Sequence, residues 1–360
     1  MNLPMTSSLL QRLGIALPII QGPMTGSDTP ALAAAVSAAG GLGMLGCGMR
    51  SPAAMAEAAA AVRQQTDRPF GMNLFVQATP NPDEATVQAA MERLAPLYAE
   101  LGLQPQRPTQ WCEDFAAQFE ALVALRPAVA SFTFGILDAA QVQRLHSAGC
   151  TVIGTATTVQ EALAWAEVGA DAVCASGLEA GGHRGTFLGD FTAAQVGTLA
   201  LVPQCVDALA PQGVAVIAAG GIMDGRGMAA AQALGAQAVQ MGTAFLACPE
   251  SGIGPAYRAA LARADATQTR ITRSFSGRPA RGITNAMMAR LQPLEHTWPA
   301  YPVHNALMGP VRRAAAEADD SDYLALWAGQ GVAAARALPA AALVQELVRE
   351  WHAARLRIAV

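Results

Sequence analysis

The chain has 360 residues, of which 52% are hydrophobic and only 14% are charged, with a formal net charge of −4. A chain of this length and apolarity can bury a large core. The acidic balance excludes the strongly basic surface that nucleic acid binding requires, so we expect no nucleic acid partner.

All 23 basic residues are arginines, and the absence of lysine excludes several enzyme classes. Pyridoxal-phosphate enzymes and Schiff-base aldolases need a lysine amine, and a nucleotide-binding P-loop needs its own lysine. An anionic ligand must therefore be held by arginine, by backbone N–H groups or by helix N-termini.

The six cysteines form no CxxC pair and show no zinc-like spacing with histidine; they are Cys47, Cys112, Cys150, Cys174, Cys205 and Cys248. We expect buried free thiols in a reducing cytoplasm and no metal site. The N-terminus has no basic region followed by an apolar run, and no apolar stretch reaches membrane-spanning length. We therefore expect neither a signal peptide nor a membrane partner.

Eight short apolar runs, each ended by glycine or a small polar residue, are typical of parallel strands covered on both faces. They are Pro18–Gly22, Gly41–Gly46, Phe70–Phe75, Val129–Gly135, Thr151–Thr155, Ala172–Ser176, Val214–Gly220 and Ala238–Gly242. Helical segments follow most of them, namely Thr29–Ala39, Ser51–Gln65, Asp138–Ala148, Thr158–Val168 and Asp224–Leu234. Eight strand–helix units favour an α/β fold of the closed (β/α)₈ type, a TIM barrel, over an open doubly wound sheet.

Two stretches of the chain are additional to the eight strand–helix units of a minimal barrel. Residues 79–127 contain proline-interrupted helical pieces, and we expect them to form a helical insertion between the third and fourth units. We predict that the barrel spans residues 1–247 and that a smaller lid, rich in glycine, proline and arginine, spans 248–313. The alanine-rich residues 314–360 should form C-terminal helices that pack back on the barrel.

Glycines follow the last two strands, where barrels of this kind often bind phosphate. Gly220 and Gly221 end the seventh unit's strand, and Gly242 ends the eighth. Glycine lets the backbone approach a ligand closely and aim its N–H groups at it. Each glycine alone can be an ordinary turn residue, but their presence in both units favours a phosphate site.

The segment after the sixth strand reads Gly181-Gly182-His183-Arg184-Gly185. Three glycines in five residues free the backbone to fold over a flat ligand. A histidine there can take a proton from carbon near neutral pH. The other four histidines are interpreted first as structural: His146, His296, His304 and His352.

Three further polar residues lie at strand ends or in this segment. Asn73 ends the third strand, and its amide can donate to and accept from a heterocycle edge, or simply cap a loop. Arg184 can hold an anionic group or carry a solvated charge. Glu179 can orient the His183 imidazole or be a solvated carboxylate.

With these residues in view, nearly the whole chain resembles the nitronate monooxygenases, flavoproteins once called 2-nitropropane dioxygenases. The matching stretches are Gln21–Gly43, Gly71–Phe75, Ala175–Leu188, Gly220–Leu246, Tyr301–Leu307 and Leu326–Gly331. AGGHRG and GGIMDGRG…QMGTAF are together highly specific. The segment LWAGQG favours the nitronate-oxidising class over relatives that reduce quinones.

The resemblance implies an FMN-binding barrel with a smaller lid, in which His183 is the base for neutral nitroalkanes. The flavin contacts it implies are Gly22, Pro23, Met24, Asn73, Ser176, Gly181, Gly182, Gly220, Gly221, Gln240, Met241, Gly242 and Thr243. Thr133 stands where many relatives carry a histidine, which puts substrate preference in doubt. Tyr301 and His304 are further candidates for substrate contact.

The implied reaction is oxidative denitrification of a small-molecule nitronate, or of a nitroalkane after His183 removes its α-proton. The substrate gives one electron to FMN, which forms a flavin semiquinone, and O₂ takes up the electron. The products are a carbonyl compound and nitrite. We expect a cytoplasmic detoxification enzyme, and assembly as a homo-oligomer is left open.

Three alternatives remain at this point. An NAD(P)H-dependent flavin reductase for quinones or enoyl thioesters can use the same barrel without a GxGxxG fingerprint. A non-redox phosphate-binding barrel would lack flavin altogether. A flavin-binding module without turnover would leave the His183 segment without a purpose.

Overall fold

The computed structural model describes residues 8–358, and a barrel of eight parallel strands lies at its centre. In chain order these strands are β1 (Ile19–Gln21), β2 (Gly43–Gly46), β3 (Phe70–Phe75), β4 (Val129–Thr133), β5 (Thr151–Ala156), β6 (Ala172–Ser176), β8 (Ala215–Ala219) and β9 (Ala238–Met241). Each strand overlaps one of the eight predicted runs, so the strand predictions are confirmed.

The sheet closes on itself between its first and second strands. Strand order runs β1-β9-β8-β6-β5-β4-β3-β2, which leaves β1 and β2 as the two ends. A parallel bridge joins Ile20 to Leu42, and the Gln21 N–H donates to the Leu42 carbonyl at 2.9 Å. The fold is therefore the predicted (β/α)₈ barrel and not an open sheet.

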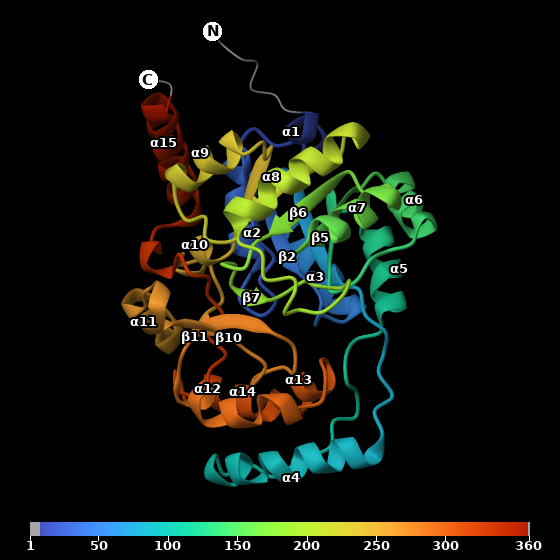
Figure 1. Ribbon diagram of the computed structural model, residues 1–360, viewed down its shortest axis with the longest axis vertical. Coiled ribbons are helices and arrows are strands. Elements are labelled where there is room, and N and C mark those ends of the chain that lie inside the picture. The colour runs from blue at the N-terminus through green and yellow to red at the C-terminus, as the bar shows by residue number, and fades with distance from the viewer. Residues whose placement is uncertain (1–7, 359–360) are drawn as a thin grey trace.

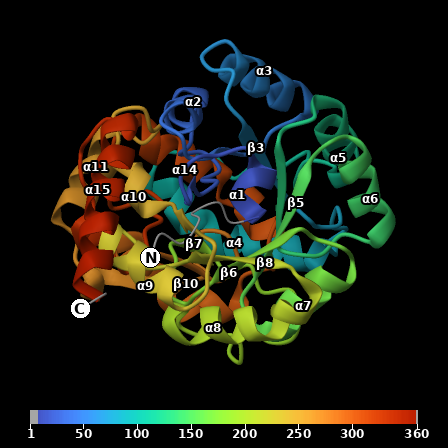
Figure 2. The same ribbon diagram turned by 90° about the horizontal axis from the view of Figure 1, so that it is seen from above.

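Helices surround the strands, as the view from above shows (Figure 2). They are α2 (Pro30–Ala38), α3 (Pro52–Arg63), α5 (Phe115–Leu125), α6 (Ala139–Ser147), α7 (Val159–Glu167), α8 (Thr198–Leu209), α9 (Gly225–Ala233) and the short α10 (Thr243–Leu246), with a 3₁₀ turn η1 (Ala210–Gln212) after α8. The five helices predicted from sequence are confirmed. Each begins after a side chain that accepts a backbone N–H as N-cap: Thr29, Ser51, Asp138, Thr158 and Asp224.

Two apolar layers hold the barrel together. One lies between the strands and the outer helices and includes the fully buried Phe132 and Trp165. The other fills the barrel interior, where α1 (Ser8–Leu13) contributes the buried Leu9 and Leu13 beside strand residues such as Ile20. Because α1 packs into this interior cluster at one end, ligand space remains at the carboxyl ends of the strands.

A second unit lies beyond those carboxyl ends (Figure 1). It contains α11 (Pro255–Arg263), η2 (Ala266–Gln268), β10 (Thr269–Thr272), β11 (Ala280–Ile283), α12 (Ala286–Leu291), η3 (Gln292–Thr297), α13 (Val303–Leu307) and α14 (Gly309–Glu317). Helices α12, α13 and α14 share an apolar cluster that includes Phe275, Trp298 and Val311, whereas α11 contributes to a separate one. We call this unit the lid.

Strand β7 (Gly182–His183) joins the barrel to the lid. It follows β6 of the barrel, yet it pairs antiparallel with β11 as the third strand of the sheet β10-β11-β7. His183 lies opposite Ala280, and Gly182 lies opposite Arg281. The segment that the sequence indicated as a loop over the ligand is thus an edge strand of the lid sheet.

The predicted insertion divides its helices between the two units. Helix α5 packs against α3 and β3 of the barrel, whereas α4 (Glu84–Glu100) contacts α13 of the lid. The hydroxyl of Tyr98 on α4 donates to the carbonyl of Leu307. The division into residues 1–247, 248–313 and 314–360 stays a prediction, and α4 and β7 both cross it.

Near the C-terminus, η4 (Val332–Ala334) precedes the long helix α15 (Ala340–Ile358), which packs on α9 and α2 of the barrel. Leu343, Leu347 and Trp351 are buried in this contact, and the Trp351 indole N–H donates to Gln232 at 3.2 Å. Within residues 8–358, no helix combines the length and apolarity needed to cross a membrane.

The close contact of α15 with α9 gives a stability prediction. A Cβ at Gly225 would collide with backbone atoms of Trp351 and Glu350. We therefore expect Gly225→Ala to lower the free energy of unfolding by about 1–3 kcal/mol, as overpacking does. Urea titration followed by circular dichroism measures the change. Gly309→Ala is the matched control, since its Cβ would meet only Arg313 Nη1, at 3.6 Å; equal losses for both variants would contradict the account.

Candidate active site

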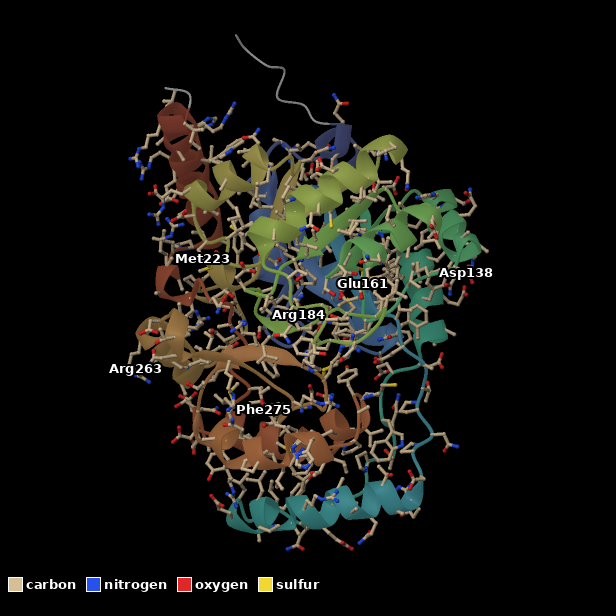
Figure 3. All side chains as sticks on the ribbon, viewed as in Figure 1. Asp138, Glu161, Arg184, Met223, Arg263 and Phe275 are labelled. Atoms are coloured by element: carbon tan, nitrogen blue, oxygen red, sulfur yellow. The ribbon has the colours of Figure 1, made fainter. Side chains whose placement is uncertain are left out.

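The carboxyl ends of the strands and the inner face of the lid enclose a cavity of about 730 Å³. This volume lies in the range of sites for cofactors and small molecules. Every predicted flavin contact lines it: Gly22, Pro23, Met24, Asn73, Ser176, Gly181, Gly182, Gly220, Gly221, Gln240, Met241, Gly242 and Thr243. The predicted residues Thr133, His183 and Tyr301 also line it. In Figure 3, the labels of Arg184 and Phe275 mark the barrel side and the lid side of this region.

Free backbone donors lie on the barrel side of the cavity. The N–H groups of Gly220, Gly221 and Gly242 donate to no other group of the described protein. Gly220 and Gly221 have positive φ angles of 109° and 72°, which a residue with a side chain rarely adopts. Free N–H groups after the last two barrel strands are suited to hold an oxyanion such as phosphate.

Asn73 is anchored within a row of polar side chains across β3, β4 and β5. Its Nδ2 donates to Ser131 Oγ at 2.9 Å and to Thr133 Oγ1 at 3.3 Å. Thr133 Oγ1 lies a further 3.3 Å from Thr155 Oγ1. Since both amide protons are used within the barrel, only the Asn73 oxygen is left to accept from a ligand.

The His183 imidazole lies among aromatic rings on the lid side of the cavity. Its centroid is 5.6 Å from those of Phe134 and Tyr301 and 5.2 Å from that of Trp327. Its Nε2 lies 2.8 Å from Ser276 Oγ. Burial, aided by the positive charges of Arg278 and Arg312, lowers the pKa of His183 to about 3. The imidazole is therefore neutral at physiological pH, and one of its ring nitrogens carries a free lone pair.

The segment that follows His183 is held in place by buried polar contacts. Both carboxylate oxygens of Glu161, on α7, are used: one accepts the N–H of Phe187 and of Leu188, and the other accepts the N–H and hydroxyl of Thr157. From the lid, Arg278 donates to the carbonyl of Arg184 at 2.9 Å and to that of Thr186 at 2.6 Å. These contacts fix the backbone from both units.

Known proteins resemble this chain over nearly its whole length. Residues 6–350 match the family model for nitronate monooxygenase. A curated nitronate monooxygenase of Pseudomonas aeruginosa is 45% identical over 96% of this chain and 99% of its own length. The chain belongs to the nitronate monooxygenase family. It is an enzyme of that family, as the sequence predicted. A probable nitronate monooxygenase of Staphylococcus aureus is 39% identical over 95% of this chain and 96% of its own length.

Solved structures place this family member beside related barrels. A nitroalkane oxidase of Streptomyces ansochromogenes superimposes with a TM-score of 0.90 at 40% identity, over 98% of this chain and 100% of that one. FabK of Thermotoga maritima superimposes less well, with a TM-score of 0.76 at 30% identity, over 99% of both chains. The nitroalkane oxidase is thus the nearer of these two in both sequence and shape.

Arg184 and Glu179 do not have the roles that were considered from the sequence. Arg184 is buried and donates to the carbonyls of Ser176 at 3.1 Å and Gly177 at 2.6 Å, so it neither holds a ligand nor is solvated. Glu179 accepts the N–H of Thr198 at 2.8 Å and its hydroxyl at 2.8 Å, at the start of α8. It caps that helix and does not contact the His183 imidazole.

His304, which the sequence offered both as a structural histidine and as a candidate for substrate contact, does not line the cavity. Its ring is fully buried in the lid, stacks on Trp298 at a centroid distance of 4.5 Å, and has Nε2 2.8 Å from the Ser274 carbonyl oxygen. It is a structural histidine, because its neighbours fill the space around it. Among the cysteines, five are buried as predicted; Cys174 borders the cavity, and Cys112 is half-buried.

Sequence reasoning named Tyr301 of the lid but missed other residues that face the site from beyond the barrel. Ser276, Trp327 and Arg312 face the site from segments without a strand–helix repeat. Trp327 falls inside the LWAGQG segment, which signalled a family but no role. Phe134 also escaped notice, although its φ of 80° is rare for a residue with a side chain.

The Glu161 contacts give a testable prediction. Glutamine at position 161 has one acceptor oxygen in place of two, so its NH₂ group would face either the Thr157 donors or the N–H groups of Phe187 and Leu188. In either orientation an unsatisfied buried donor costs about 1–3 kcal/mol and loosens the anchor of this segment. We expect Glu161→Gln to speed hydrogen exchange at Phe187 and Leu188 by about 10- to 100-fold. Hydrogen–deuterium exchange with mass spectrometry measures this. Glu167→Gln, exposed on the same helix, is the control; unchanged exchange in both variants would contradict the anchoring role.

Proposed function

We propose that the chain oxidises alkyl nitronates to carbonyl compounds and nitrite, with FMN as cofactor and O₂ as electron acceptor. The observation that carries this proposal is the placement of a neutral His183 and the free N–H groups of Gly220, Gly221 and Gly242 on one cavity. The 45% identity to the Pseudomonas nitronate monooxygenase supports the choice of substrate class.

The residues on the cavity fit FMN. The FMN phosphate would bind the N–H groups of Gly220, Gly221 and Gly242, since no lysine exists to hold it. The Asn73 oxygen offers an acceptor, and heterocycle N–H groups of a flavin supply matching donors. When bound, the flavin supplies the redox chemistry, which the protein orients and shields.

The protein's own side chains account for the remaining steps. Phe134, Tyr301 and Trp327 surround the imidazole and exclude water from the reacting carbon. His183 takes the α-proton when the substrate is a neutral nitroalkane, and a preformed nitronate needs no such base. The substrate thus meets a base on the lid side and a cofactor on the barrel side.

Ser276 favours one tautomer of His183. Its hydroxyl oxygen lies 3.2 Å from the Arg278 carbonyl, which can only accept, so the hydroxyl proton is directed there. The Ser276 oxygen is then free to accept from the Nε2–H of His183 at 2.8 Å. In this arrangement the lone pair is on Nδ1, which is the atom that would accept the substrate proton.

Anaerobic mixing of the FMN-loaded protein tests the proposal. We expect propionate 3-nitronate to change the flavin absorbance and NADPH to leave it unchanged. On admission of air, nitrite should form and O₂ should be consumed. Full bleaching by NADPH with the nitronate inert would instead assign the protein to the flavin reductases, the alternative on the same barrel.

Replacement of His183 separates its role as a base from flavin binding. We expect His183→Asn to reduce nitroalkane turnover by about 100- to 10,000-fold, the usual contribution of a general base. Turnover of the corresponding preformed nitronate should change little, because it has no α-proton to lose. Steady-state kinetics on matched nitroalkane and nitronate pairs measures both. Equal loss on the two substrates would contradict the base assignment.

A further inference from the structure

The turn that follows β1 forms part of the barrel side of the cavity. Its residues 24–27 all line the cavity. The turn is tight, because the N–H groups of Ser27 and Asp28 donate to the Met24 carbonyl at 2.7 and 2.9 Å. Met24 lies against the end of β9, since a Cβ added to Gly242 would be 3.6 Å from Met24 Sδ. The turn therefore reaches the place where we propose that FMN binds.

Asp28 closes this turn and joins it to β2. Its side chain is fully buried. One carboxylate oxygen, Oδ2, accepts the N–H of Met24 at 2.6 Å and the N–H of Gly46, at the end of β2, at 2.7 Å. Hydrogen bonds to an ionised acceptor are stronger than those between neutral groups. A single carboxylate thus connects the cavity-lining turn to the neighbouring strand end.

Other contacts of the turn are neutral and close. A Cβ at Gly46 would lie 2.6 Å from the backbone nitrogen of Thr25, so the strand end and the turn touch directly. On the side of the lid, the N–H of Gly252 donates to the Ser27 carbonyl at 2.8 Å, and both residues line the cavity. Asp28 is therefore the charged contributor to the hold on this turn.

The second carboxylate oxygen of Asp28 faces Arg50, in the turn after β2. Arg50 lines the cavity, and its Nη2 lies 3.5 Å from Oδ1, which accepts no hydrogen bond from the described residues. The nearby Cys47 thiol is neutral, because burial raises its pKa to about 12. The Glu250 carboxylate accepts the N–H of Ala340 at 3.0 Å. Arg50 is thus the charge that acts on Asp28.

The charge state of Asp28 changes in an accessible pH range. Burial raises the pKa of Asp28 to about 6, although the two backbone N–H groups and Arg50 oppose this rise. A neutral acid accepts N–H bonds more weakly than a carboxylate does, and it leaves Arg50 without a counter-charge. The hold on Met24 is therefore full above this pKa and weakens as the pH falls through it.

We propose that Asp28 is a positioning residue for the flavin: its carboxylate ties the turn after β1 to the end of β2 and thereby sets Met24 in place for the cofactor. The inference rests on the proposed function for the identity of that cofactor. Asp28 does not itself line the cavity, so it acts through Met24 and Arg50. FMN should then bind the ionised form of Asp28 more tightly than the neutral form.

The FMN affinity of the full chain freed of cofactor tests this role without turnover, and quenching of flavin fluorescence measures it. The FMN phosphate also titrates near about pH 6, so the informative quantity is the Kd of Asp28→Asn divided by the native Kd at each pH. We expect this ratio to be about 10 at about pH 7.5 and about 1 at about pH 5, since asparagine resembles the neutral acid. Asp67→Asn is the matched control: Asp67 is exposed, and its ratio should stay near about 1 throughout.

Arg50→Met tests the same contact with the carboxylate left in place. Loss of the guanidinium should raise the pH at which FMN affinity falls, because Arg50 lowers the pKa of Asp28. Arg68→Met is the matched control, since Arg68 is the exposed partner of Asp67, and it should leave that pH unchanged. A lower transition pH in Arg50→Met, or an equal shift in Arg68→Met, would overturn the proposal.

Hydrogen exchange of the cofactor-free chain supplies a readout without flavin. The N–H groups of Met24 and Gly46 should exchange about tenfold faster in Asp28→Asn than in the native protein at about pH 7.5. Unchanged exchange would overturn the proposal. Faster exchange with native FMN affinity at every pH would also overturn it, because Asp28 would then be a purely structural residue.

Nitronate oxidation by the same proteins separates this inference from the proposed function. If the FMN-loaded native protein oxidises nitronates while Asp28→Asn binds FMN as the native protein does, the positioning role is rejected and the proposed function stands. If FMN affinity depends on Asp28 as expected but no nitronate is oxidised, the proposed function is rejected and the positioning role stands.

Discussion

Closure of the parallel sheet between β1 and β2 is the constraint on which the site depends. Because all eight strands run in one direction, closing the sheet brings all their carboxyl ends to one rim. Asn73, the Gly220-Gly221 pair and Gly242 are far apart in sequence, yet they border one cavity for this reason. The buried Gln21 side chain reinforces the closure, since its oxygen accepts the N–H of Met44 at 3.0 Å.

The second constraint is the pairing of β7 with β11. A segment that leaves the barrel after β6 becomes the edge of the lid sheet, and His183 is thereby held over the rim. Glu161 from the barrel and Arg278 from the lid anchor the same segment at its far side. The histidine is therefore positioned by both units at once, and a change in the lid alone would move it.

The features that depend on local sequence patterns were predicted correctly from the sequence. Apolar runs gave the strands, the segments between them gave five of the outer helices, and glycines gave the rim. The roles of Glu179 and Arg184 could not be predicted from the sequence, because the residues around a charged side chain in a glycine-rich segment do not show which distant group it will contact. Ser276 and Arg312 were equally out of reach, since lid topology alone brings them to the cavity.

The family match concerns the class of enzyme, whereas the geometry concerns the local chemistry of the cavity. The match over residues 6–350 makes the chain a nitronate monooxygenase family member. The geometry adds the local chemistry: a neutral imidazole among aromatic rings, and free N–H groups on the opposite side. In the proposed function, these features give the cavity a cofactor side and a substrate side.

A crystal structure of the FMN complex tests this division most directly. The account predicts the phosphate within hydrogen-bond distance of the N–H groups of Gly220, Gly221 and Gly242, and the isoalloxazine ring facing His183 with Asn73 at its edge. A phosphate held by Arg312, or an isoalloxazine outside the space between His183 and the barrel rim, would contradict the account.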